Sequence, residues 1–176
     1  MNYIITLTLV HFSRVLDELT AIQLASVSGL FATFKHRCES QPLEQVTPVF
    51  HVDQYFPWQT FDLFLSFFSG SGRDIDWDSG DLVEFVNISH YFMVHEQFLT
   101  RVFRAPLSDN FYPLYEENQL CAVMFTLKMR NYLSVARSLL VHASREYDGI
   151  FVFGDLLLAD SIDHFRQLVN NRSTGL

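Results

Sequence analysis

Alternating apolar and polar positions mark the first part of the chain, and they predict three short strands. Residues 4–10 alternate apolar side chains with Thr6 and Thr8, the pattern of a strand with one buried face. Residues 14–19 and 49–52 have a similar character. These three segments are therefore predicted to form one small sheet.

Helices are predicted between the second and third strands. Thr20 is a suitable N-cap for a helix over 21–25, and Leu30–Phe34 predicts a further helical turn or two. Residues 36–48 are polar and include two prolines, so they are predicted to form a loop.

After residue 56 the apolar spacing is helical. Pro57 can open a helix, because its missing N–H would have no partner in the first turn. That helix carries an apolar stripe at i, i+3, i+4 and i+7 formed by Phe61, Phe64, Leu65 and Phe68.

Residues 81–103 predict two helices with a break near Met93. Asp81 can cap the first of them, and Glu84 can complete a capping box. Residues 117–144 predict a second helix pair, broken near Arg130, and 150–170 predict one or two further helices. One core is expected to hold Leu7, Leu24, Phe31, Phe61, Phe64, Phe85 and Phe92.

Composition narrows the class of protein. The chain has 176 residues, 49% of them hydrophobic, and a formal charge of −8, which disfavours binding to nucleic acid. No apolar run approaches the ~20 residues of a membrane span. Cys38 and Cys121 are the only cysteines, and the start lacks a basic signal-peptide region. We expect a cytoplasmic or nuclear protein, or a virion protein if it is viral.

The predicted order, strand-strand-helix-helix-strand-helix and then a helix pair, resembles the BTB/POZ domain, the interaction domain of cullin adaptors and Kelch-type proteins. The segment Val27–Phe34 resembles the "SPVFRAMF" segment of that family. The resemblance implies a helix-rich α/β (α+β) fold, with a three-stranded sheet and packed helices over residues 1–105.

The rest of the chain, residues 106–176, is predicted to be an all-helical extension. Pro106 and Pro113 bracket the polar turn that separates it from the first part. Residues 119–169 resemble the front of a BACK domain, the helical partner that follows BTB in many substrate adaptors. Alternatively, 118–145 is a helix pair of the same kind as 81–103.

The BTB/POZ resemblance implies a non-enzymatic adaptor, and a cullin or ubiquitin-ligase partner is one form of it. Cullin-recruiting members share an apolar-x-Glu motif, which aligns here with Arg37-Cys38-Glu39, so Glu39 is kept and the apolar position is Arg37. The alternative is a structural subunit that self-associates in a homo-oligomer or a viral particle such as a coat.

Aromatic residues in loop-like segments are the other candidate contacts. Large apolar side chains outside the helical stripes often anchor protein interfaces. The predicted interface residues, besides Glu39, are Tyr55, Phe56, Trp58, Trp77, Phe111, Tyr112 and Tyr115. Alternatively, the loop aromatics around residues 55–58 and 111–115 cover the small cores from outside.

Candidate catalytic and metal chemistry is weak. The acidic segment 74–80 resembles a calcium loop, but Gly80 and Glu84 are each one position away from where an EF-hand needs them. The seven histidines form no clustered ligand pairs for zinc. No nucleophile elbow or phosphate-binding loop is present. We therefore expect no enzyme activity, no metal and no cofactor.

Overall fold

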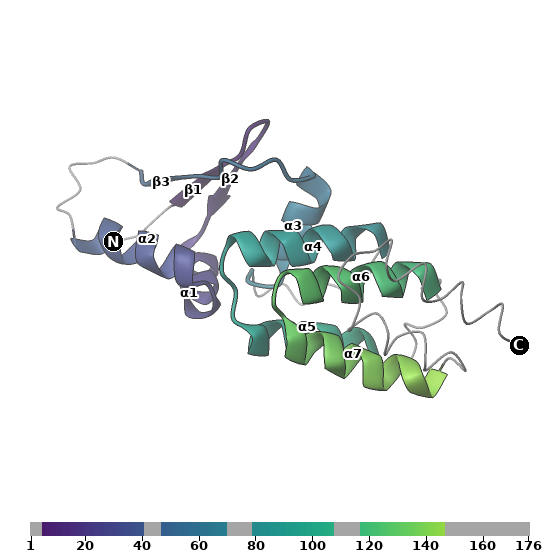
Figure 1. The fold of residues 1–176 in the computed structure, drawn as a ribbon. Coiled ribbons are helices and arrows are strands. Elements are labelled where there is room, and N and C mark those ends of the chain that lie inside the picture. The colour runs from purple at the N-terminus through teal and green to yellow at the C-terminus, as the bar shows by residue number, and fades with distance from the viewer. Residues whose placement is uncertain (1–4, 41–46, 70–78, 108–116, 147–176) are drawn as a thin grey trace, which may run out of the picture. The chain divides into compact units, whose positions relative to one another are not determined.

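The computed structural model describes residues 5–40, 47–69, 79–107 and 117–146. These ranges form a helix-rich mixed α/β fold with a three-stranded sheet (Figure 1). In chain order the elements are β1 (Ile5–Thr8), β2 (Ser13–Leu16), α1 (Glu18–Val27), α2 (Gly29–Ser40), β3 (Val49–His51), α3 (Trp58–Ser66), α4 (Ser79–Tyr91), α5 (Glu96–Leu107), α6 (Glu117–Met129) and α7 (Leu133–Glu146).

The chain folds as two compact units. The described residues up to 69, together with Asn87–His95, form the first unit, and residues 79–86 with the described residues from Glu96 onward form the second. The predicted boundary after residue 105 falls inside α5, which continues through Pro106 to Leu107. The division into 1–105 and 106–176 remains a prediction.

The sheet of the first unit has the strand order β2-β1-β3. β1 and β2 form an antiparallel hairpin, whereas β1 and β3 are parallel, so α1 and α2 form the connection between them. The hairpin closes where Leu9 N–H donates to the Phe12 carbonyl at 2.8 Å. All three predicted strands are confirmed, although each is shorter than its sequence pattern suggested.

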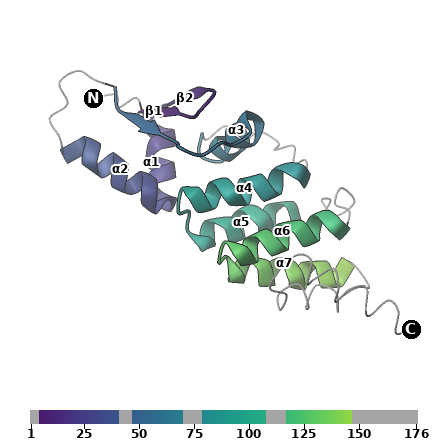
Figure 2. The same ribbon diagram turned by 45° about the horizontal axis from the view of Figure 1, so that its top comes forward.

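The two faces of the sheet differ in burial, because successive side chains of a strand point to opposite faces. The helix α2 runs along one face of the sheet (Figure 2). Ile5, Leu7 and Phe50 are buried on that face, where the rings of Phe31 and Phe50 are 5.8 Å apart. On the opposite face, Val15 pairs in register with Thr6 and is 66% exposed. The sheet is therefore packed on one side only by the described helices.

The first helix begins earlier than predicted. Asp17 is the N-cap of α1, and its carboxylate accepts a hydrogen bond from the Thr20 N–H at 2.7 Å. That hydrogen bond lowers the pKa of Asp17. The prediction of Thr20 as the cap is wrong, because the carboxylate three residues upstream satisfies the free N–H of the first turn.

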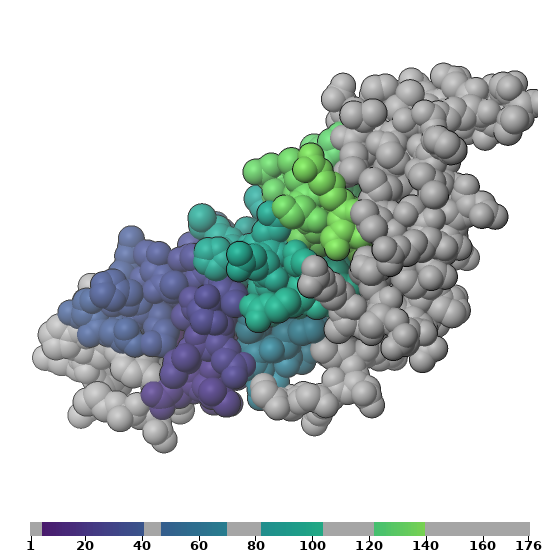
Figure 3. Space-filling model, turned by 90° about the horizontal axis from the view of Figure 1, so that it is seen from below, coloured from purple at the N-terminus to yellow at the C-terminus, as the bar shows by residue number. Residues whose placement is uncertain are grey.

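The second helix is longer than predicted. α2 begins after Ser28, whose Oγ accepts from the Phe31 N–H at 3.0 Å and donates to the Phe92 carbonyl. The helix continues to Ser40, so residues 36–40 are helical and not part of the predicted loop. In the space-filling view α2 lies beside α1 on the surface of the first unit (Figure 3).

Aromatic rings fill the core of the first unit. Phe92 is fully buried, and its ring lies 5.5 Å from Phe64 and 5.7 Å from Phe50, in stacked arrangements. All four residues of the stripe predicted for α3 are buried, but the helix ends at Ser66, so Phe68 lies in the turn that follows it. Six members of the predicted core are buried in this unit: Leu7, Leu24, Phe31, Phe61, Phe64 and Phe92.

The remaining member of the predicted core, Phe85, lies in the second unit. Its buried ring packs edge-to-face on Phe103, with the centroids 6.5 Å apart. The helix that carries it, α4, begins at Ser79, so the predicted role of Asp81 as its N-cap is wrong.

Both predicted helix breaks are confirmed, and they share one geometry. Met93 and Asn131 have positive φ values of 52° and 64°. The N–H of the following residue reaches five residues back: Val94 to Ser89 at 2.9 Å, and Tyr132 to Leu127 at 2.8 Å. Each break is a Schellman turn with a buried side chain after the left-handed residue. The likeness agrees with the alternative that the second helix pair is of the same kind as the first.

A glutamate from α5 caps α7 in the second unit. Glu96 Oε1 accepts from the backbone N–H of Ser134 at 2.6 Å and of Val135 at 3.3 Å. Glu96→Ala is expected to lower the free energy of unfolding by about 1 kcal/mol, because those N–H groups lose their acceptor. Glu96→Gln keeps an acceptor oxygen and should lose less. Urea unfolding of both variants tests this, and equal losses would contradict a capping role.

None of the helices in the described ranges is long and apolar enough to cross a membrane.

Candidate protein-interaction surface

The segment between β3 and α3 is held in place at three points. Val52 N–H donates to the Thr8 carbonyl at 2.8 Å, which extends the sheet by one bond. The Tyr91 hydroxyl donates to Asp53 Oδ1 at 2.8 Å and accepts from the Asp53 N–H at 3.3 Å. Phe56 is buried, with its ring 5.6 Å from that of Tyr91. The backbone of this segment is therefore fixed by the core beneath it.

This segment and the start of α3 present large side chains to solvent. Tyr55 is 63% exposed, and Trp58, the first residue of α3, is 53% exposed. The Tyr55 ring makes an edge contact with His11 in the turn of the β1–β2 hairpin, at a centroid distance of 5.4 Å. We call the exposed side chains of Val10, His11, Asp53, Tyr55 and Trp58 the loop–hairpin surface.

The two parts of this surface are locked together by contacts behind it. Arg14 of β2 makes a bidentate ion pair with Asp62 of α3, at 2.6 Å and 2.7 Å. The guanidinium also lies over the Phe12 ring, 4.9 Å from its centroid. Phe12 in turn contacts Phe61 at 5.8 Å. The hairpin is therefore tied to α3 by both polar and aromatic contacts.

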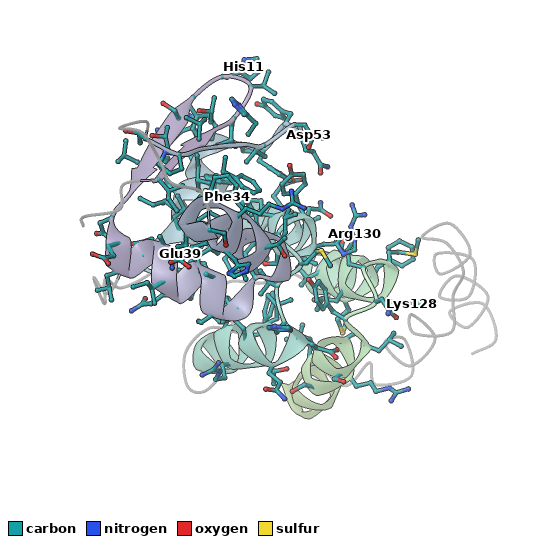
Figure 4. The ribbon with its side chains drawn as sticks, turned by 90° about the vertical axis from the view of Figure 1, so that its left-hand side faces the viewer. His11, Phe34, Glu39, Asp53, Lys128 and Arg130 are labelled. Atoms are coloured by element: carbon teal, nitrogen blue, oxygen red, sulfur yellow. The ribbon has the colours of Figure 1, made fainter. Side chains whose placement is uncertain are left out.

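Figure 4 shows His11 and Asp53 at the same end of the sheet. Glu39 lies on α2, away from them. Its carboxylate is exposed and pairs with Lys35 one turn earlier. Arg37 is exposed as well, whereas Cys38 between them is buried, and burial raises the pKa of its thiol. Glu39 and the aromatic residues thus lie on two different surfaces.

The predicted interface residues have different outcomes. Tyr55 and Trp58 are exposed, as an interface role requires, and that role remains a prediction. Phe56 is only 2% exposed, so the prediction that it is a surface anchor spared from the core is wrong. Its ring contacts the fully buried Phe61 and the half-buried Tyr91 below the loop. Four predicted residues lie outside the described ranges: Trp77, Phe111, Tyr112 and Tyr115.

Several residues of the loop–hairpin surface were not identified from the sequence. His11 and Val10 lie in the tight turn of the hairpin, and Asp53 is the second residue after β3. The contact between His11 and Tyr55 joins positions far apart in the chain, so no local pattern could indicate it. Two exposed apolar side chains of α1, Leu19 and Ile22, were missed as well.

No group of three or more His, Cys, Asp or Glu side chains within the described ranges is arranged to hold a metal ion. The acidic segment that resembles a calcium loop lies mostly outside those ranges.

Comparison of the chain with protein-family models, with curated proteins and with solved structures finds no match.

Proposed function

We propose that this protein is a non-enzymatic adaptor that binds a protein partner through the loop–hairpin surface. The observation that carries the proposal is the exposure of Tyr55, on a segment whose backbone is fixed from below, and of Trp58 at the start of the helix that follows it. An anchored loop loses little conformational freedom on binding, and Tyr and Trp are enriched among the residues that dominate interfaces.

The BTB/POZ resemblance supports the same proposal. The element order from β1 to α5 is the order on which that resemblance rests, and α4 and α5 stand where the closing helix pair is expected. Within the segment that resembles "SPVFRAMF", Ser28 caps α2 and Phe31 is buried. We propose a BTB-like domain followed by helices that resemble the front of a BACK domain.

A cullin is one candidate partner, and Glu39 would be its contact. Glu39 is exposed near the end of α2, as a binding residue must be. Arg37, at the position where cullin-recruiting members have an apolar residue, is exposed and charged. A cullin partner would therefore contact a charged side chain at that position, where cullin-recruiting members offer an apolar one.

Self-association is the second candidate function, and the open face of the sheet favours it. Val15 and Val49 are 66% and 39% exposed, and both pair in register with Thr6 on the face opposite the core. β2 is also an edge strand, and such strands readily pair with a second chain. A homo-oligomer or a particle subunit would use this face.

Tyr55→Ala and Trp58→Ala are each expected to weaken partner binding by about 2 kcal/mol, because truncation removes an exposed aromatic anchor. The free energy of unfolding should change little, since neither side chain is part of the core. Calorimetric titration with the partner identified by co-purification from the native source measures the binding, and urea unfolding measures the stability.

Gln59→Ala is the matched control, because Gln59 is also exposed on the first turn of α3 but is not aromatic. Unchanged binding in both aromatic variants would contradict the proposal. If Glu39→Ala alone abolished binding to a cullin, the contact surface would be α2. A native mass above that of one chain, lowered by Val15→Asp, would instead support self-association.

A further inference from the structure

We propose that the loop–hairpin surface binds an arginine side chain of the partner, held by the carboxylate of Asp53 and the ring of Tyr55. The inference rests on the proposed function, and it adds the chemistry of the partner. The charge, the hydrogen bonds and the aromatic exposure at this surface carry it.

Asp53 gives the surface its negative charge. The Tyr91 hydroxyl donates to Oδ1, which fixes the orientation of the carboxylate, and no hydrogen bond from a described residue reaches Oδ2. The other carboxylate close to this surface, Asp62, is already neutralised by Arg14. Because the whole chain has a formal charge of −8, a basic partner is also attracted over longer distances.

An exposed aromatic side chain two residues from that carboxylate would suit a guanidinium group. Tyr55 lies two residues after Asp53, and the residue is 63% exposed although its ring contacts His11. A guanidinium is planar and weakly hydrated, so it can stack on a ring while its N–H groups donate to a carboxylate. An ammonium group is more strongly hydrated and lacks the planar fork. The surface therefore favours arginine over lysine.

The same combination already occurs within the protein. Arg14 donates two hydrogen bonds to Asp62 while its guanidinium lies 4.9 Å from the centroid of the Phe12 ring. A carboxylate and an aromatic ring thus hold an arginine on the adjoining part of the hairpin. We infer that Asp53 and Tyr55 offer an incoming arginine a comparable pair of groups.

The experiment is an NMR titration of the 15N-labelled full chain with the peptide N-acetyl-Leu-Arg-Leu-amide. The control peptide has citrulline in place of arginine, which keeps the shape and removes the charge. We expect saturable shifts of the amide signals of residues 53–59 and of the hairpin turn, with a Kd of about 1 to 10 mM. The citrulline peptide should bind about tenfold more weakly, because it loses both the ion pair and the ring interaction.

Two variants locate the binding site. Asp53→Asn keeps an oxygen that can accept from Tyr91 and should weaken binding of the arginine peptide about fivefold. Tyr55→Ala should have a similar effect. Glu18→Gln is the charge control, because Glu18 is an exposed carboxylate on α1, and it should leave binding unchanged.

Any of three results would overturn the inference: equal binding of the arginine and citrulline peptides, equal binding of a lysine peptide, or no saturable shift at residues 53–59. An equal effect of Glu18→Gln and Asp53→Asn would also overturn it, since it would show unspecific attraction. If an identified partner still lost affinity with Tyr55→Ala, the adaptor proposal would stand without the arginine.

Discussion

Phe92→Ala is expected to lower the free energy of unfolding by about 3 to 5 kcal/mol, the largest effect of any substitution considered for this protein. The Phe92 ring is fully buried and packs on Phe50, Phe61, Phe64 and Tyr91, with centroid distances between 5.4 Å and 6.0 Å. Removing it leaves a cavity bounded by rings from β3, α3 and α4, which cannot all move inward together. Urea unfolding followed by circular dichroism measures the loss.

Phe34→Ala is the matched control for that prediction. Phe34 lies on α2 with its ring 4.9 Å from Phe50, but its side chain is only half-buried (Figure 4). Its truncation should lower the free energy of unfolding by about 1 to 2 kcal/mol. Losses of the same size in the two variants would contradict the placement of Phe92 at the centre of the core.

The sequence predicted the elements well where a pattern extended over several residues. The stripe of α3 is an example: four apolar residues at helical spacing leave few alternatives, and Phe61 and Phe64 are fully buried. The two helix breaks were also predicted, although neither left-handed residue is a glycine. The burial of Val94 and Tyr132 after the breaks is the hydrophobic contact that commonly accompanies such turns.

Helix starts were predicted poorly, because several neighbouring residues have the same capping chemistry. Asp17 and Thr20 are both good N-caps, and the three-residue spacing between them lets the first accept from the N–H of the second. At α4 the helix already includes Ser79, two positions before Asp81, so Asp81 lies within the first turn and not at the cap. A single sequence cannot rank such neighbours without the contacts that follow.

The candidate surface was predicted only in part, because burial in a loop depends on contacts from distant segments. Phe56 and Tyr55 are adjacent and chemically alike, yet the first is buried against Tyr91 and the second contacts His11 at the hairpin turn. No local pattern distinguishes them. The orientation of the Asp53 carboxylate depends on the hydrogen bond from Tyr91, which lies 38 residues further along the chain.

Ser28→Ala is expected to lower the free energy of unfolding by about 2 to 4 kcal/mol, although it removes a single oxygen atom. Ser28 is 1% exposed, and its hydroxyl accepts from the Phe31 N–H and donates to the Phe92 carbonyl. Both backbone groups would lose this partner in a buried place where water cannot replace it. Thermal and urea unfolding of the variant measure the loss.

Gly29→Ala, at the next residue, is the control that shows whether the loss comes from the Ser28 hydroxyl or from any change of side chain where α2 begins. A methyl group there would meet the Met93 carbonyl oxygen at 3.8 Å and the Met93 Cβ at 3.9 Å, which are ordinary contacts. It should therefore leave stability unchanged or raise it by about 0.5 kcal/mol, because alanine favours the helix more than glycine. Ser28→Thr keeps the hydroxyl and should recover part of the loss. If Ser28→Ala were as harmless as Gly29→Ala, the hydroxyl would not be what joins the start of α2 to the end of α4.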